Sequence, residues 1–202
     1  DELEKRSSVP VEIRELAARW LSEDIGTIKN IRNILDDPID SMSRMVKVCD
    51  YLEQEAYDKK VLIFTHFTGT HRLFRQLLTK VFGENHCAFF CEGMSPDELE
   101  LNTYRFQNDP GYRIMLSDES GGEGRNFQKA DELICIDLPW SANTLEQRIG
   151  RLDRIGRDKD KDVVSVIVYA QDSVEKDLAE IWNKVDHCQK SRQAKQKKVT
   201  IF

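Results

Sequence analysis

The chain has 202 residues, of which 40% are hydrophobic and 33% are charged, so it can bury a core and is not a disordered chain. Its 30 Lys and Arg are outnumbered by 36 Asp and Glu, and the net charge of -6 excludes a generally basic, histone-like coat for nucleic acid. No apolar run approaches the roughly 20 residues that a membrane-spanning helix needs, and the charged first residues lack the apolar segment of a signal peptide.

The amino-terminal segment differs in composition from the middle of the chain. Because the chain begins with Asp1 rather than Met, we expect it to be a piece of a longer protein. Residues 1–39 are charged and weakly amphipathic, with Pro10 and Pro38 as boundaries, and they predict a helical extension or linker outside the main core. The regular pattern that follows predicts one main domain over residues 40–185.

The last segment, residues 186–202, is predicted to be a basic tail. Residues 184–198 contain six Lys or Arg and one Asp, a composition that is typical of a solvated surface segment. A contact of this tail with nucleic acid is the alternative that the same charges allow.

Between these ends, short apolar runs of strand type alternate with segments of helical periodicity. The runs predicted as strands are residues 59–65, 86–91, 112–117, 132–137 and 163–170. Helices are predicted over 40–57, 68–83 and 173–185. A further helix is predicted to begin at the capping-box sequence Ser95-Pro96-Asp97-Glu98, and another is predicted within 141–157. Strands that alternate with helices predict an α/β fold, in which helices sandwich a parallel sheet.

The five cysteines form no C-x-x-C pair, and three of them lie inside apolar runs. This usage is typical of buried, reduced thiols in a cytoplasmic protein. Neither the cysteines nor the four histidines show the spacing of metal ligands, so we predict no metal site in this chain.

Ligands of open α/β sheets bind at the carboxyl ends of the strands, so the loops after the predicted strands are where chemistry is expected. The loop after 112–117 contains Gly121, Gly122 and Gly124 within four residues. Glycine permits close approach of a backbone to a phosphate or a ribose. An ordinary tight turn explains the same glycines equally well.

The segment LEQRIGRLDRIGR, residues 145–157, repeats arginine every third residue. On a helix, Gln147, Arg151 and Arg154 would share one face, and two guanidinium groups aimed at one point could stabilise a transferring phosphoryl group. The alternative is a solvated charged face, paired with neighbouring acidic side chains. The chain contains no GxxxxGK[ST] sequence and no D-E-x-H box, so it lacks a phosphate cradle and we expect another domain to hold most of the nucleotide.

Three stretches together resemble a known family: KVLIFTHFTGTHRLFRQLL, CEGMSPDELELNTYRFQND and IMLSDESGGEGRNFQKADELICIDLPWSANTLEQRIGRLDRIGR. They are similar to the C-terminal RecA-like lobe of superfamily 2 helicases, specifically of SWI/SNF-type ATPases, and GEGRNFQ and EQRIGRLDRIGR resemble the bacterial RapA branch. The resemblance covers residues 40–185 and implies a RecA-like parallel sheet sandwiched by helices, with extra N-terminal helices. Where SWI/SNF proteins commonly have GGLGLN, this chain has GGEGRN.

The resemblance also implies roles for individual residues. Those expected at the nucleotide are Glu119, Gly122, Gly124, Gln147, Arg151 and Arg154, with Arg151 and Arg154 as the catalytic pair at the γ-phosphate of ATP. Those expected at the nucleic acid are Thr65, His66, Phe67, Gly93, Ser95 and Asn126.

By this resemblance the chain would be the second motor lobe of an ATP-dependent translocase or helicase, inactive by itself. ATP and Mg²⁺ would be bound mainly by an N-terminal RecA-like lobe of the same parent protein. The expected partners are nucleic acid, with double-stranded DNA favoured, and RNA polymerase, in the bacterial cytoplasm or nucleoid and with no membrane. The alternative is a non-catalytic docking module for nucleic acid or RNA polymerase. A glycosyltransferase half is disfavoured, because sugar transfer has no need of paired arginines.

Overall fold

The computed structural model describes residues 38–118, 127–139, 141–152, 164–170, 173–186 and 195–201. Its contacts divide the chain into two units, Asp1–Ser43 and Arg44–Phe202, and the second unit holds the sheet. The helices expected before Pro38 therefore lie outside the described residues. Among the residues that the structure describes, no helix has the length and apolar character needed to cross a bilayer.

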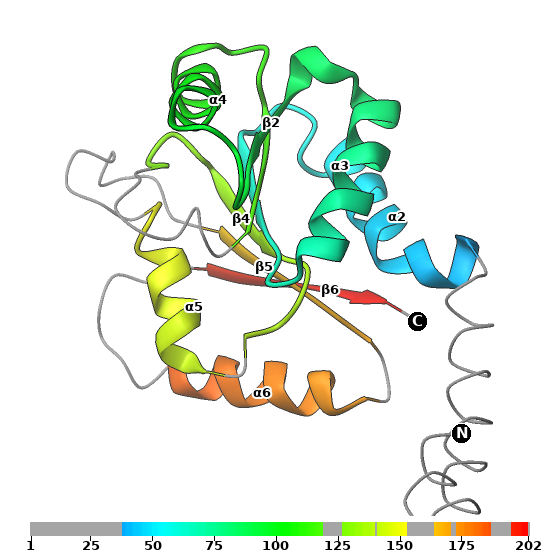
Figure 1. The fold of residues 1–202 in the computed structure, drawn as a ribbon. Helices are drawn as coiled ribbons and strands as arrows, with labels where there is room; N and C mark the ends of the chain where they lie inside the picture. The colour runs from blue at the N-terminus through cyan, green and yellow to red at the C-terminus, as the bar shows by residue number, and fades with distance from the viewer. Residues whose placement is uncertain are drawn as a thin grey trace, which may run out of the picture. The chain divides into compact units, whose positions relative to one another are not determined.

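Helices and strands alternate along most of the described chain, with β3 followed directly by β4 in the order of described elements (Figure 1). The helices are α2 (Pro38–Gln54), α3 (Thr68–Phe82), the short 3-10 helix η1 (Glu84–His86), α4 (Pro96–Asn108), α5 (Ala142–Ile149) and α6 (Val174–Asp186). The strands are β1 (Val61–Phe64), β2 (Cys87–Phe90), β3 (Ile114–Ser117), β4 (Glu132–Cys135), β5 (Val164–Ala170) and β6 (Lys195–Ile201).

The strands form one six-stranded sheet in the order β2-β3-β1-β4-β5-β6, and every neighbouring pair is parallel. In β1–β4 all four residues of each strand are buried, which is expected of a parallel sheet covered on both faces. Figure 1 shows α4 and α5 on one side of the sheet and α2 and α3 on the other. The predicted helix-sandwiched parallel sheet is confirmed.

The core beneath α4 and α5 is built from alternate residues of the central strands. Leu62 and Phe64 of β1 pack in one cluster with Phe106 of α4 and Leu145 of α5. The same cluster contains Leu152, which follows α5 in the chain and is fully buried. This packing fixes α5 and the residues just after it against the strands whose ends are expected to carry the chemistry.

Local signals set two helix boundaries as predicted. Ser95 caps α4 by accepting a hydrogen bond from the Glu98 amide, while the Glu98 side chain accepts one from the Ser95 amide, which completes a capping box. At the end of α3 the chain turns at Gly83, whose φ of 84° is a conformation that other residues rarely adopt.

Three of the cysteines, Cys49, Cys87 and Cys135, are buried. Burial raises the pKa of the Cys49 and Cys87 thiols to about 12, so both stay protonated at neutral pH. Cys91 is only partly buried. The predicted burial is confirmed for the first three, and Cys188 lies outside the described residues.

The carboxyl-terminal tail departs from expectation. Residues Lys195–Ile201 form β6, which pairs in parallel with the whole of β5. The tail thus contains a strand that its lysine-rich composition did not predict. Lysine is nevertheless common on strands at the edge of a sheet, where charge discourages pairing with a second molecule.

Candidate functional site

The carboxyl ends of β1, β3 and β4 meet at one edge of the sheet. In the register, Phe64 at the end of β1 lies opposite Ser117 of β3 and Cys135 of β4. The residues that follow these three strands are Thr65, Asp118 and Ile136. This is the edge at which the ligands of open parallel sheets bind.

The first loop at this edge, Thr65 to Phe67, contains three of the predicted nucleic-acid residues. Thr65 is fully buried, and its amide donates to the Ser117 carbonyl at 3.1 Å. Its hydroxyl accepts a hydrogen bond from the Phe67 amide at 3.3 Å. His66 and Phe67 are exposed, with their rings edge to face at 5.3 Å between centroids. Thr65 therefore shapes the loop, while the His66 and Phe67 side chains are exposed at the edge of the sheet.

A residue that the sequence did not single out joins this loop to the end of β4. Oδ2 of Asp137 accepts a hydrogen bond from the His66 amide at 2.5 Å and a long one from the Thr65 hydroxyl at 3.5 Å. Sequence offered one signal for it, since Asp137 is the first polar residue after the buried run ELICI, at the edge where ligands bind.

The loop after β2 contains the other described residues that were predicted to contact nucleic acid. Gly93 is exposed and has a φ of 88°. The Ser95 hydroxyl donates to Oε2 of Glu98 at 2.9 Å and accepts from the Glu98 amide, so it is engaged in the helix cap. The Ser95 amide donates to the same Glu98 carboxylate oxygen at 2.9 Å, and this bond, together with the one from the Ser95 hydroxyl, lowers the pKa of Glu98. The loop is attached to β3, because Oδ2 of Asp118 accepts from the Glu92 amide at 2.8 Å.

Helix α5 begins at the same edge, and two adjacent side chains on it have opposite environments. Gln147 is exposed, as expected of a residue that contacts a ligand. Arg148 is only 2% exposed; its Nη1 donates to the Asp137 carbonyl at 3.2 Å, and its guanidinium lies over the Phe64 ring at 5.5 Å. Arg148 thus fastens α5 to the ends of β1 and β4.

The helix expected over 141–157 ends earlier than predicted. α5 stops at Ile149, and the amides of Arg151 and Leu152 bond to carbonyls three residues back, at 3.3 and 3.0 Å. Arg151 therefore lies in a tighter turn beyond the helix, so the expectation that it shares one helical face with Gln147 is wrong. Gly150 is the C-cap residue, and its amide still bonds to the Glu146 carbonyl.

The turn at Arg151 lies against the segment that follows the glycine-rich loop. The Arg151 carbonyl accepts a hydrogen bond from the Phe127 amide at 3.1 Å, and the Arg151 side chain is partly buried. The predicted site residues Glu119, Gly122, Gly124, Asn126 and Arg154 lie outside the described residues. The described part of the site thus brings Arg151 next to the end of the loop where the nucleotide was expected.

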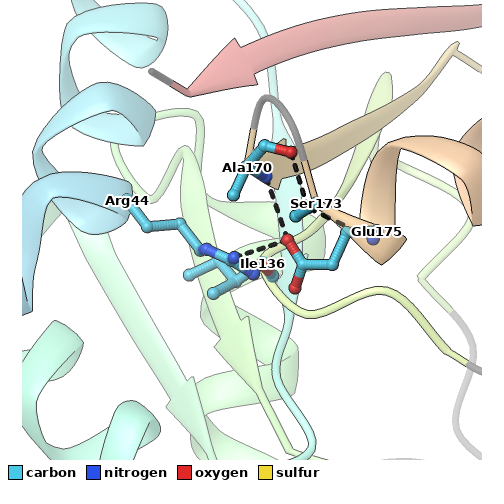
Figure 2. A network of polar contacts seen from close by, with 5 residues as sticks. All are labelled: Arg44, Ile136, Ala170, Ser173 and Glu175. Carbon is cyan, nitrogen blue, oxygen red and sulfur yellow. Dashed lines mark hydrogen bonds and ion pairs between the residues drawn. The ribbon is translucent and has the colours of Figure 1, made fainter. Parts of the chain in front are cut away.

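A polar network holds the ends of β4 and β5 in place (Figure 2). Arg44 of α2 donates from Nη1 to the Ile136 carbonyl and from Nη2 to Oε2 of Glu175, both at 2.7 Å. The same carboxylate oxygen accepts from the Ala170 amide at 2.9 Å. The Ser173 hydroxyl donates to the Ala170 carbonyl at 2.7 Å and accepts from the Glu175 amide, which shapes the start of α6.

The described part of the chain contains no group of three or more His, Cys, Asp or Glu side chains that could hold a metal ion. The polar groups that the structure describes at this edge include the exposed His66 imidazole and Gln147 amide, the partly buried Arg151 side chain and backbone amides. Such groups suit phosphate oxygens, which accept hydrogen bonds and carry negative charge.

Comparison with known protein sequences matches this chain to one domain family and to a group of bacterial relatives. The sequence profile of the helicase conserved C-terminal domain matches residues 43–156. The RNA polymerase-associated protein RapA of Proteus mirabilis is 42% identical over 106 residues, 52% of this chain and 11% of that protein. RapA of Vibrio vulnificus strain YJ016 is 38% identical over 126 residues, 62% of this chain and 13% of that protein. The chain thus spans only about a tenth of the length of these curated relatives.

Solved structures show the same fold at lower identity. The C-terminal part of the Fun30 ATPase domain superposes with a TM-score of 0.56 at 20% identity, over 67% of this chain and 43% of that one. The Sulfolobus solfataricus SWI2/SNF2 ATPase core in complex with double-stranded DNA gives 0.57 at 21% identity, over 79% and 35%. Domain 2 of the DEAD-box helicase Mss116p, bound to an RNA duplex, gives 0.56 at 19% identity, over 78% and 58%.

These comparisons confirm the RecA-like fold and the RapA resemblance that the motifs predict. The matched profile covers more than half of the chain and includes the ends of β1, β3 and β4 together with α5. The chain therefore belongs to the helicase conserved C-terminal domain family. It has the RecA-like fold and is similar in sequence to RapA proteins.

Proposed function

We propose that this chain is the second motor lobe of an ATP-driven nucleic-acid translocase. A preceding RecA-like lobe of the same parent protein holds ATP and Mg²⁺, and closure of the two lobes brings Arg151 and Arg154 to the γ-phosphate. The observation that carries the proposal is the hydrogen bond between Arg151 and Phe127, because it holds the arginine turn beside the end of the glycine-rich loop.

Arginine is suited to this role for physical reasons. Its guanidinium group stays charged at all physiological pH values and can donate two parallel hydrogen bonds to phosphate oxygens. Charge that develops on a transferring phosphoryl group is stabilised by such donors when they are already in place. Gln147, which is exposed on α5, offers its side-chain amide as a further hydrogen-bond donor to ATP.

The nucleic-acid grip is assigned to the exposed residues of the loop after β1. His66 and Phe67 project from an edge whose backbone is fixed by Thr65 and Asp137. Contacts to phosphates position a protein on a duplex without reading its sequence and need few positive charges, which fits an acidic chain. Double-stranded DNA is the proposed substrate, supported by the fold shared with a SWI2/SNF2 core bound to that ligand.

The test is arginine substitution in the full-length protein. Arg151→Ala and Arg154→Ala should leave ATP binding nearly intact and lower DNA-stimulated turnover by about a thousandfold, as for other arginine fingers. Arg72→Ala, which removes an exposed arginine of α3, is the matched control and should leave turnover unchanged. Turnover that survives both finger substitutions would contradict the proposal, as would robust ATPase activity of these 202 residues alone.

A second candidate is a docking module for RNA polymerase in the bacterial cytoplasm or nucleoid. It is favoured by the similarity to RapA proteins, which are RNA polymerase-associated. Retention of the full-length protein on purified bacterial RNA polymerase, with and without residues 1–39, tests this candidate. Polymerase retention combined with no DNA-stimulated turnover would favour docking over the motor.

A further inference from the structure

The loop after β4 lies between the two parts of the proposed machinery. On one side, Oδ2 of Asp137 accepts a hydrogen bond from the His66 amide at 2.5 Å, in the loop assigned to nucleic acid. On the other side, the main-chain carbonyl of Asp137 accepts from Nη1 of Arg148 at 3.2 Å, on the helix that leads to Arg151. One residue therefore contacts both the nucleic-acid loop and the arginine-bearing segment.

The connection through Asp137 is supported by rigid neighbours. The Ile136 amide donates to the Phe64 carbonyl at 3.0 Å, so the loop starts in register with the end of β1. Arg148 is 2% exposed and lies over the Phe64 ring, so α5 cannot shift freely relative to that strand. A displacement of the His66 backbone would thus be carried into α5, because close-packed interiors transmit strain.

The choice of a carboxylate at this position is not explained by stability alone. Oδ2 of Asp137 accepts two hydrogen bonds, whereas Oδ1 is buried with no hydrogen-bond partner among the described residues. A buried oxygen without a partner lowers stability, since it has lost its hydration. A carboxylate does, however, make a stronger bond to the His66 amide than a neutral acceptor would.

We propose that Asp137 is a positioning residue that couples nucleic-acid binding at His66 and Phe67 to the placement of α5 and Arg151. The proposal rests on the proposed motor function and assigns the coupling within it to one side chain. Asp137 touches neither ATP nor nucleic acid; it acts through the His66 amide and through Arg148.

The decisive variants are Asp137→Ala and Asp137→Asn in the full-length protein. Alanine removes the acceptor, whereas asparagine keeps an oxygen in place without the charge. The chain offers a matched control in Asp131, whose Oδ2 accepts from the Lys60 amide at 2.9 Å. That bond also joins the β1 and β4 segments through a carboxylate and an amide, but it lies at the opposite end of the strands.

The main measurement is the ratio of turnover with saturating linear double-stranded DNA to turnover without it. We expect Asp137→Ala to lower this ratio by about five-fold or more, the lower end of usual coupling between sites, with the KM for ATP unchanged. Asp137→Asn should retain part of the ratio, and Asp131→Asn all of it. An unchanged ratio in Asp137→Ala, or an equal fall in Asp131→Asn, would overturn the proposal.

Hydrogen exchange of the same full-length variants separates this proposal from the motor function. Asp137→Ala should raise amide exchange both at residues 65–68 and at 142–152, and Asp131→Asn at neither. If the unmodified protein shows no DNA-stimulated turnover, the motor function is wrong and exchange alone decides whether Asp137 links the two segments. A rise at residues 65–68 with no change at 142–152 would refute the link.

Discussion

Arg44 and Glu175 lie 131 positions apart in the chain and are joined by an ion pair of 2.7 Å between Nη2 and Oε2. The other terminal nitrogen of Arg44 donates to the Ile136 carbonyl, and the Glu175 carboxylate also accepts from the Ala170 amide. One pair of side chains therefore joins α2 to the residues after β4 and β5. The residue next to Ile136 is Asp137, so this pair supports the loop on which the candidate site is built.

Arg44→Ala should destabilise the fold by about 1.5–2 kcal/mol, the lower part of the range for hydrogen bonds to charged groups. The lower part applies because the two side chains remain 27% and 30% exposed. Arg44→Lys keeps the charge but cannot donate in two directions from a planar group, so it should lose part of the same free energy of unfolding. Urea unfolding of each variant gives the comparison.

A double-mutant cycle with Glu175→Gln isolates the pair. We expect a coupling free energy of about 1 kcal/mol between positions 44 and 175. The control pair is Lys47 and Asp50 on α2, which are 3.9 Å apart and nearly half exposed, and whose coupling should be about 0.5 kcal/mol or less. Equal coupling in the two cycles would show that the Arg44 pair is an ordinary surface contact.

Much of this architecture can be predicted from local sequence. The continuous apolar run in β1 predicts a strand buried on both faces, and that is its environment. The capping box at Ser95 and Glu98 and the turn at Gly83 are formed by residues close in sequence, so the sequence pattern was enough to predict them. The meeting of the β1, β3 and β4 loops follows in turn from the parallel order of the strands.

The rest depends on tertiary contacts that periodicity does not record. Arginines at every third position look alike in sequence, yet Arg148 is buried over Phe64, while Arg151 lies in a turn beyond α5. Asp137 could not be recognised as part of the site from sequence, because its partner, the His66 amide, lies 71 positions away in the chain. β6 was missed because pairing with β5, rather than its own composition, makes it a strand.

The Lys60 ammonium group caps the C-terminus of α4 from a distant part of the chain, so its removal should lower the free energy of unfolding. Its Nζ donates to the carbonyls of Phe106, Asp109 and Tyr112 at 2.5, 2.7 and 2.9 Å and lies over the Phe106 ring at 5.2 Å. Lys60→Met keeps an apolar stem on that ring but leaves these carbonyls without the ammonium group. We expect a loss of about 1–3 kcal/mol, measured by thermal and urea unfolding.

The control for Lys60 is Lys129→Met, which removes an exposed ammonium group. Its effect on the free energy of unfolding should stay within about 0.5 kcal/mol, as for most surface substitutions. If Lys60→Met were equally neutral, water would be replacing the ammonium group at these carbonyls, and the lysine would not be a structural cap.

Substitution of Phe67 should weaken nucleic-acid binding without changing the stability of the fold. Its side chain is 59% exposed next to His66, so Phe67→Ala should change the free energy of unfolding by no more than about 0.5 kcal/mol. In the full-length protein the same change should weaken binding of double-stranded DNA several-fold, without altering the salt dependence, because no charge is removed. Leu73→Ala, at a 42% exposed position on α3, is the matched control and should leave DNA affinity unchanged.

His71 should make the stability of the domain depend on pH. It is 3% exposed, and its Nε2 lies 3.3 Å from the Leu116 carbonyl, so the neutral ring donates a hydrogen bond there. Burial lowers its pKa below the usual value of 6.5, an effect that outweighs the Leu116 hydrogen bond and the charge of Asp118. The unfolded chain therefore binds a proton at a higher pH than the folded domain does.

Because the unfolded state binds more protons below about pH 6.5, the free energy of unfolding should fall as the solution is acidified from that pH toward the pKa of the folded state. This group alone can contribute a slope of at most about 1.4 kcal/mol per pH unit. His71→Gln keeps a donor for the Leu116 carbonyl but does not titrate, so its stability should fall less between pH 7.5 and 5.5. Parallel pH profiles of the two proteins in urea unfolding would show instead that His71 is protonated equally in the folded and unfolded states.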